Sequence, residues 1–257
     1  MSTAHRGPML FSRPDVPFDG IPLGLANVVN RDRSGVVLGG DSPYLGPLTA
    51  GTLGGWVLTE VTGGGASVAV NSLGQLVITS GTTDEDNSQL QYAARPFIYS
   101  TTRKLACFAR LKVSTDITSD ALFGLVVADT TLISASAEAS TDGIYFFKAA
   151  TATDWTFHVQ ASGTGSTGTS GITIASDTFM VIGFTVVGGA IRFYAKNDSG
   201  AAHKTSPNFL GAGTAIVNTN APAGSTNLLL SLLVGQEGGT TSRVMTVDWA
   251  FATQWDV

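Results

Sequence analysis

The segment Thr178–Lys196, TFMVIGFTVVGGAIRFYAK, constrains the fold more than any other part of the sequence. Two apolar runs rich in β-branched and aromatic residues are joined by Gly188-Gly189. Glycine reaches positive φ without steric cost, so this pair suits a tight two-residue hairpin turn. The second run alternates between two faces: Ile191, Phe193 and Ala195 on one, and Arg192, Tyr194 and Lys196 on the other. This pattern predicts a β-hairpin at the centre of an all-β domain.

The composition agrees with a chain of short strands joined by many turns. Of the 257 residues only 13% are charged, and 31 are glycine, which does not suit helices with salt-bridged faces. A chain of this length buries a sizeable core, so its stability does not require disulfides or metals. The single cysteine, Cys107, lies in the apolar run Leu105–Leu111, where a buried structural thiol is the favoured interpretation. The absence of cysteine pairs is compatible with assembly in a reducing cytosol.

The charge and hydropathy patterns indicate which partners to expect. The net charge of −5 has no basic counterweight that would favour binding to a nucleic acid. No apolar run reaches the roughly 18 residues of a membrane-spanning helix. The start, MSTAHRGPML, lacks the apolar core of a secretory signal. We therefore expect a soluble protein of cytosolic origin, with neither a nucleic acid nor a membrane among its partners.

Residues 1–47 differ from the rest of the chain and predict an extended arm. Six of the nine prolines fall here, and proline fixes φ and removes a donor, which excludes helices and interrupts strands. Only Gly35–Gly39, GVVLG, is typical of a short strand. Such a segment cannot build its own core, so it needs a surface to lie on, and we expect a neighbouring chain to supply it. The candidate partner contacts are basic or apolar: Arg6, Leu10, Phe11, Arg13, Phe18, Arg31 and Arg33.

Residues 48–257 predict a second unit, a sandwich of two antiparallel sheets. Runs of strand length alternate with clusters of turn-forming residues, and no repeat period emerges. In Lys104–Val113 the alternation places Leu105, Cys107, Ala109, Leu111 and Val113 on one face, as expected for a strand with one buried face. Ala121–Ala128 is apolar throughout, which favours burial of both faces. In Val244–Phe251 the alternation places Met245, Val247, Trp249 and Phe251 together on one face.

Three segments between these strands predict turns or loops. Asp129–Ser140 offers a capping residue but no strong helical stripe, so we expect at most a short helical turn. Gly143–Lys148 and Thr156–Gln160 resemble a hairpin pair around a loop, Ala149–Trp155. Ser162–Gly171, SGTGSTGTSG, is of low complexity and predicts a mobile loop or a solvent-facing connection.

No constellation of residues in the sequence predicts catalysis. Glycosidases place two carboxylates across the sugar, but no strand carries an E-x-D-x-E pattern, and a G-x-S-x-G motif is absent as well. His5, His158 and His203 have no neighbours at metal-ligand spacing, and a half-buried structural role is favoured for His158. The acidic run Asp84–Asp86 fits a calcium site or a solvated turn, of which we favour the turn. We therefore predict no enzyme, no metal and no cofactor.

Aromatic residues near the predicted loops are the candidates for contact with a glycan. The four tryptophans could stack on sugars, but for the set we favour packing in the core. Trp155, in a predicted loop, is the one whose context favours exposure, and Tyr145 lies close to loops as well. Trp155 and Tyr145 are therefore the candidate glycan contacts.

Several segments between residues 74 and 255 together resemble a known family. They are GQLVITSGTTDEDNSQLQY, LACFARLKV, ALFGLVVADTTLI followed by TDGIYFFK, DTFMVIGFTVVGGAIRFYAKNDSG and VMTVDWAFATQW. The most specific part is the pattern at Ala128–Leu132 and Asp142–Phe146. These segments resemble the concanavalin A-like (laminin-G/lectin-like) jelly-roll domain found in virion proteins of tailed bacteriophages. The resemblance does not extend to residues 1–47.

The resemblance implies a jelly-roll sandwich and a structural place on the virion. Members of this kind often decorate or cement capsids and many form trimers, which implies the major capsid protein as partner, a homotrimer, and a place on the capsid exterior after synthesis in the host bacterial cytoplasm. Our first hypothesis is accordingly a capsid decoration protein that is anchored through its arm. The alternative is a glycan-binding module on a head or tail fibre that aids adhesion to the host. The fold alone does not decide between them, and no matching motif allows lectin calcium or sugar ligands to be carried over.

Overall fold

The computed structural model describes residues 35–39, 51–53, 55–61, 64–73, 75–114, 118–134, 137–138, 142–198, 214–216 and 220–256. Within these ranges the chain forms strands and turns and no helix. The short helical turn predicted at Asp129–Ser140 is therefore wrong where this segment is described: it holds two short paired strands, β9 Ile133–Ser134 and β10 Ala137–Glu138. No helix long and apolar enough to cross a membrane occurs in the described ranges.

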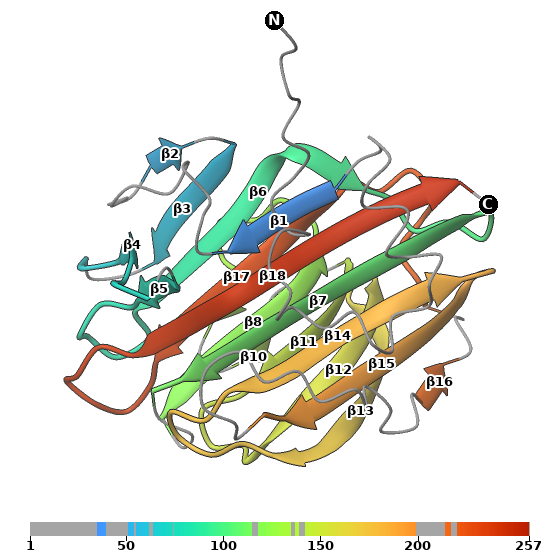
Figure 1. Cartoon of the computed structure of the whole chain (residues 1–257). Coiled ribbons are helices and arrows are strands. Elements are labelled where there is room, and N and C mark those ends of the chain that lie inside the picture. Colours follow the sequence, from blue (N-terminus) through green and yellow to red (C-terminus); the bar gives the residue numbers. More distant parts are fainter. Residues whose placement is uncertain are drawn as a thin grey trace, which may run out of the picture.

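The other strands form two antiparallel sheets that face each other as a sandwich (Figure 1). The sheet in front in that view, here called the β7 sheet, runs β16 Thr214–Ile216, β15 Ala190–Asn197, β14 Met180–Val187, β7 Arg103–Val113, β18 Val244–Asp256, β5 Leu76–Thr79 and β4 Ser67–Val70, with β1 Gly35–Gly39 also paired to β18. The sheet behind it, the β8 sheet, runs β13 Thr164–Thr173, β12 Asp154–Ala161, β11 Gly143–Lys148, β8 Ser119–Val126, β17 Leu228–Gln236, β6 Asn87–Phe97, β3 Trp56–Val61 and β2 Gly51–Leu53. This arrangement confirms the predicted all-β, two-sheet antiparallel sandwich.

The main core lies between the sheets, because alternate residues of each strand point to opposite faces. On β7 the predicted inward face is confirmed: Leu105, Cys107, Ala109, Leu111 and Val113 are all buried in this core. β8 and β17 are buried along their whole length, which for β8 confirms the prediction that both faces are covered. Burial raises the pKa of the Cys107 thiol well above its ordinary value, which fits a structural role.

The predicted hairpin of Thr178–Lys196 is present as β14 and β15. Gly188 and Gly189 form its turn at φ values of 58° and 81°. Residues that carry a Cβ atom rarely adopt such positive φ values. The Tyr99 hydroxyl donates a hydrogen bond of 3.0 Å to the Gly189 carbonyl, which fixes the turn against the segment that follows β6. The hairpin nevertheless lies toward one edge of the β7 sheet, whose centre is formed by β7 and β18. The prediction of a central position is therefore wrong.

A β-bulge changes which residues of β18 face the core. The register of β18 against β7 shifts between Val247 and Trp249, so that Asp248 is an extra residue. Val247 points into the core before the bulge, and Ala250 and Ala252 do so after it. A bulge of this kind exchanges the two faces of a strand without ending it.

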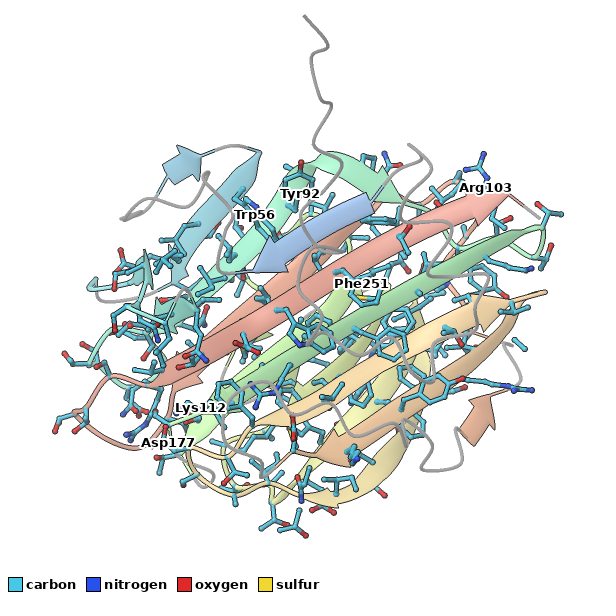
Figure 2. The ribbon with its side chains drawn as sticks, viewed as in Figure 1. Trp56, Tyr92, Arg103, Lys112, Asp177 and Phe251 are labelled. Atoms are coloured by element: carbon cyan, nitrogen blue, oxygen red, sulfur yellow. The ribbon has the colours of Figure 1, made fainter. Side chains whose placement is uncertain are left out.

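The aromatic residues after the bulge consequently lie on the outer face of the β7 sheet. Phe251 pairs with Phe108 in the register of the two strands, their ring centroids are 5.7 Å apart, and Figure 2 shows Phe251 in the middle of this face. Trp249 stacks on Phe251 at 6.0 Å. The prediction that Trp249 and Phe251 share a face with Met245 and Val247 is therefore wrong, because strict alternation cannot anticipate an inserted residue.

Arg110 of β7 braces the bulge from the neighbouring strand. Its Nη1 lies 3.0 Å from Asp248 Oδ2, and its Nε lies 2.7 Å from Asp198 Oδ2. The guanidinium also lies over the ring of Phe179, 4.0 Å from the centroid. Asp248 accepts a further hydrogen bond from Gln75 at 3.2 Å. Arg110 is only 3% exposed, so its charge depends on these carboxylates for compensation.

The only part of the predicted arm within the described ranges is the strand at Gly35–Gly39, which confirms that local prediction. It pairs with β18 of its own chain, from Gly35 opposite Thr253 to Gly39 opposite Trp249. For these five residues the supporting surface in the structure is the chain's own sheet. Residues 1–34 and 40–47 lie outside the described residues, and the division of the chain at residue 47 stays a prediction.

The contacts of Arg110 predict that its loss lowers the stability of the fold far more than the loss of Lys112, a second cation on β7. Arg110→Met should lower the free energy of unfolding by about 3 kcal/mol, because it leaves two largely buried carboxylates without their cation. Lys112→Met is the matched control: Lys112 also lies near Phe179 and pairs with Asp177 at 3.1 Å, but Asp177 is exposed (Figure 2). That control should cost less than about 1 kcal/mol. Denaturant unfolding measures both, and equal losses would contradict this role of Arg110.

Candidate functional site

A second apolar cluster lies on the outer face of the β8 sheet. Its members are Leu122, Val126, Leu132, Ile133, Tyr145, Phe147 and Leu233. Leu132 and Ile133 belong to the segment that follows β8, and we call residues 127–134 with 137–138 the strap. Because the strap covers the middle of this face, apolar residues on β8, β11 and β17 are buried on both sides of the sheet.

Two glutamines of β6 hold the strap on the sheet. The Gln89 amide donates to the carbonyl of Asp129 and accepts from the N–H of Leu132 at 3.0 Å. Gln91 accepts from the N–H of Asp129 at 3.2 Å and donates to the carbonyl of Val127 at 3.1 Å. Backbone pairing within the strap is limited to the short strands β9 and β10. The two glutamines therefore supply hydrogen-bond partners for strap backbone groups outside these strands.

Beside the strap, the outer face of the β8 sheet carries a group of polar side chains that we call the polar patch. It comprises Glu138, Thr156, His158, Gln160, Thr167 and Thr169. Pairing of β12 with β13 sets Thr156 opposite Thr169 and His158 opposite Thr167. Thr167 and Thr169 are exposed, whereas His158 and Gln160 show only 5% and 9% of their surface. The patch therefore presents two exposed threonines beside a largely buried imidazole and a largely buried amide.

His158 joins the parts of the polar patch. Its Nε2 lies 2.8 Å from the Thr156 hydroxyl, and its Nδ1 lies 3.1 Å from Oε1 of Glu138 on the strap. This contact holds the pKa of the Glu138 carboxyl below its ordinary value of 4.5, against the opposing effect of burial. The order of hydroxyl, imidazole and carboxylate is that of a hydrolase triad. However, the Thr156 hydroxyl donates its proton to the Phe147 carbonyl at 2.9 Å, so this proton is not directed at the imidazole as it is in a triad.

Tyr145 supports the polar patch from below and does not contact solvent. Its ring stacks on His158, with centroids 5.1 Å apart and an angle of 8° between the planes. Its hydroxyl donates to Gln160, and burial followed by the nearby Glu138 charge raises the pKa of that hydroxyl. Tyr145 is 0% exposed, so its prediction as a glycan contact is wrong. It packs beneath His158 and Gln160.

Trp155 lies on the opposite side of the sheet from the polar patch. β12 begins at Asp154, so Trp155 belongs to a strand and not to the predicted loop. Its alternation with Thr156 turns the indole into the main core, where it meets Phe146 edge-on at 6.5 Å and is 0% exposed. The prediction of an exposed glycan contact is therefore wrong. Core packing also holds for Trp56, which contacts Tyr92 at 4.9 Å (Figure 2).

The sequence prediction missed the two exposed threonines of the polar patch. Ser162–Gly171 was expected to be a loop or a connection, but the described chain forms a regular strand, β13, from Thr164 to Thr173. The glycines of this segment stand at irregular spacing, at positions 163, 165, 168 and 171, so the sequence shows no two-residue period that would predict a strand. Apolar residues are also absent up to Gly171, because an edge strand does not need a fully buried face.

The acidic run Asp84–Asp86 forms a turn in which the carboxylates of Asp84 and Asp86 accept hydrogen bonds from the backbone. Asp86 accepts from the N–H of Thr83 at 2.8 Å, and Asp84 accepts from the N–H of Gly238 at 2.6 Å. Glu85, between them, adopts a positive φ of 65°. In the described ranges no group of three or more acidic, histidine or cysteine side chains is arranged to hold a metal ion. The contacts are those of the turn that we favoured.

The candidate partner contacts of the arm receive no structural description. Arg6, Leu10, Phe11, Arg13, Phe18, Arg31 and Arg33 all lie outside the described residues. They stay predictions from the sequence.

Comparison with solved structures defines the class of the fold as a concanavalin A-like jelly roll of the legume-lectin type. Peanut lectin with a bound 9-residue peptide matches at a TM-score of 0.53 and 12% identity, covering 87% of this chain and 100% of the lectin. The lectin UEA-II in complex with galactose matches at 0.52 and 15% identity, covering 86% and 98%. The Ca²⁺-bound exoplasmic/lumenal domain of VIP36 matches at 0.53 and 12% identity, covering 86% and 90%.

These similarities confirm the predicted fold and leave the activity open. At such low identity a shared fold does not imply a shared ligand. No protein-family model matches the chain, and no curated protein matches it.

The contact between Glu138 and His158 predicts how the attachment of the strap depends on pH. Because folding lowers the pKa of Glu138, its contribution to stability is present above 4.5 and is lost as the pH falls through the lower folded-state pKa. Glu138→Gln removes this contribution. The difference in free energy of unfolding between wild type and Glu138→Gln should therefore shrink as the pH falls below 4.5.

Denaturant unfolding at a series of pH values measures this difference. Glu85→Gln, which changes an exposed glutamate in another turn, controls for the loss of one carboxylate. A difference between wild type and Glu138→Gln that stays constant across the acid range would contradict the contact.

Proposed function

We propose that this chain is a glycan-binding module and that the polar patch is its binding surface. The observation that carries this proposal is the arrangement of Thr167, Thr169, His158 and Gln160 on two paired strands. Sugar hydroxyls both donate and accept hydrogen bonds, so a sugar site needs mixed donors and acceptors in fixed positions. The patch supplies hydroxyl, imidazole, amide and carboxylate groups on one face.

The spacing of the polar patch supports contact with more than one sugar hydroxyl. Residues two apart on a strand are separated by about 6.6 Å, and paired strands by about 4.8 Å. Thr167 and Thr169 on β13, with His158 and Thr156 opposite them, thus form a small grid of polar groups. Tyr145 and Glu138 hold the buried members in place, which lowers the cost of ordering them on binding.

A structural place on a phage particle is the second proposal. It is supported by the sequence pattern at Ala128–Leu132 and Asp142–Phe146 and by the proline-rich residues 1–47. In this role the arm binds the major capsid protein, and the sandwich projects from the capsid exterior as an oligomer. The two roles are compatible, because the arm and the polar patch are different parts of the chain.

The capsid proposal predicts that an arm truncation abolishes attachment. Deleting residues 1–34 spares β1, which pairs with the sandwich, so the truncated chain should fold with an unchanged melting temperature. Co-sedimentation with phage heads should show binding of the full chain and none of the truncated chain. Equal binding of both chains, or of neither, would contradict the anchoring role.

The glycan proposal predicts that two exposed hydroxyls contribute measurably to affinity. Thr167→Ala with Thr169→Ala should weaken binding about tenfold, since two hydrogen bonds of about 0.5–1.5 kcal/mol are lost. A glycan array identifies the ligand and titration calorimetry gives the dissociation constants. Thr240→Ala with Thr241→Ala, two exposed threonines between β17 and β18, is the matched control and should leave affinity unchanged. An array without a binder, or equal affinity of both double variants, would contradict the proposal.

A further inference from the structure

The positive charges of the described side chains are divided unequally between the two sheets. The lysines and arginines of the β7 sheet are Arg103, Lys104, Arg110, Lys112, Arg192 and Lys196, and Arg243 directly precedes β18. In the β8 sheet the one lysine or arginine with a described side chain is Lys148. It is 0% exposed, and its ammonium group donates to the carbonyls of Ser119 and Ala149 at 2.7 and 3.1 Å. This charge is therefore withdrawn from the outer face of the β8 sheet.

Carboxylates, by contrast, border the polar patch. Glu138 belongs to the patch, and its contact with His158 holds the pKa of this carboxyl below its ordinary value of 4.5, so the group is ionised at neutral pH. Asp154 stands two residues before Thr156 on β12. Because Trp155 between them points into the main core, Asp154 and Thr156 point to the outer face. The polar patch thus lies on a face with two carboxylates and no lysine or arginine among the described side chains.

The charge of Asp154 is poorly compensated within the described part of the chain. Its Oδ1 is buried and has no hydrogen-bond partner there. The residue as a whole is only half-buried, so its carboxylate can still be approached from solvent. A charge that is partly withdrawn from water acts more strongly on a neighbouring ion than a fully solvated charge does. Asp154 therefore favours a cationic group on a ligand that lies along β12.

We propose that the polar patch selects glycans that carry free amino groups and disfavours glycans that carry carboxylate or sulfate groups. This inference rests on the proposed function of the polar patch. A protonated amino group brings a positive charge and several N–H donors, and the carboxylates of Glu138 and Asp154 are suitable acceptors for a charge-assisted hydrogen bond. The hydroxyls of Thr167 and Thr169 then bind hydroxyl groups of the same ligand.

An acidic glycan meets the opposite situation at the polar patch. Its carboxylate or sulfate groups would lie near Glu138 and Asp154, and no described lysine or arginine side chain on this face offsets the repulsion. β6 also carries Arg95, but β17, β8 and β11 separate β6 from β12. An unfavourable contact with the wrong ligand contributes to specificity in the same way as a favourable contact with the right one. An N-acetylated sugar carries neither charge, so its affinity should lie between the two.

Three oligosaccharides of different charge test this selection: a glucosamine tetramer, an N-acetylglucosamine tetramer and a galacturonate tetramer. Calorimetric titration of the full chain in mildly acidic buffer above pH 4.5 keeps Glu138 ionised and the amino groups protonated. The glucosamine tetramer should bind about tenfold more tightly than the N-acetylated tetramer, since a charge-assisted hydrogen bond is about twice as strong as a neutral one. The galacturonate tetramer should show no measurable binding. Added salt should weaken the binding of the glucosamine tetramer alone.

Variants that remove the two charges identify the groups responsible. Asp154→Asn and Glu138→Gln keep the shapes of the side chains, and each should reduce the preference for the glucosamine tetramer over the N-acetylated one. The double variant should lose this preference. Asp154→Asn is the cleaner of the two, because Glu138→Gln also changes a contact of the strap. Glu85→Gln, which changes an exposed glutamate in the turn before β6, is the matched control and should retain the full preference.

Equal affinity for all three oligosaccharides, or a preference for the galacturonate tetramer, would overturn the selection by charge. A preference for the glucosamine tetramer that the double variant retains would overturn it as well. These outcomes differ from a failure of the glycan site itself. If a neutral glycan binds and Thr167→Ala with Thr169→Ala weakens it, but no preference for amino groups is found, the site holds and the selection is wrong. If no glycan of any charge binds, both are wrong.

Discussion

The contact of Arg110 with Asp248 and Asp198 determines how the two central strands of the β7 sheet fit together. β18 inserts one extra residue, Asp248, against β7, and the insertion exchanges the two faces of the strand. Arg110 binds the carboxylate at this point from the neighbouring strand and ties in Asp198, which follows β15. Since both carboxylates and the guanidinium are largely withdrawn from water, the three groups are stable together and costly apart. Small residues, Ala250 and Ala252, can then face the core after the bulge, while aromatic residues cover the outside.

The outer face of the β8 sheet is apolar at its centre. Because the central strands of this sheet are apolar on both sides, their outer side has to be covered, and the strap forms this covering layer. The strap ends at Glu138, which contacts His158 on β12, and there the apolar cover gives way to the polar patch. The functional candidate thus lies where a covered surface meets an open one. Neighbouring side chains already hold the polar groups there in position.

Alternation within strands could be read from the sequence, and it placed most of the core correctly. Lys104–Val113 is the clearest case, because its five inward residues were all identified. The errors arose where a strand boundary or an inserted residue changes which residues of the strand face the core. The bulge at Asp248 could not be predicted, and a strand that begins at Asp154 instead of after Trp155 moved a tryptophan from the surface to the core. β13 was missed because its sequence has no two-residue alternation and almost no apolar residue.

The polar patch could be recognised only in part from the sequence. Tyr145 was identified as a site residue, but it is fully buried beneath His158 and Gln160. His158 was expected to be structural, and its ring is indeed buried. Its contact with Glu138 joins residues twenty positions apart through a strap whose path depends on packing against Gln89 and Gln91. No spacing rule along the sequence encodes that path.

Mapping the bound ligand by NMR tests the central claim most directly. In a titration of the ¹⁵N-labelled chain with the best ligand from a glycan array, saturable shift changes should centre on the backbone amides of Thr156–Gln160 and Thr167–Thr169. Amides of the Asp84–Asp86 turn and of the hairpin turn at Gly188-Gly189 should stay unchanged, because they belong to other parts of the surface. Shift changes that centre on those turns, or saturable binding that leaves β12 and β13 unaffected, would contradict the assignment of the polar patch as the glycan site.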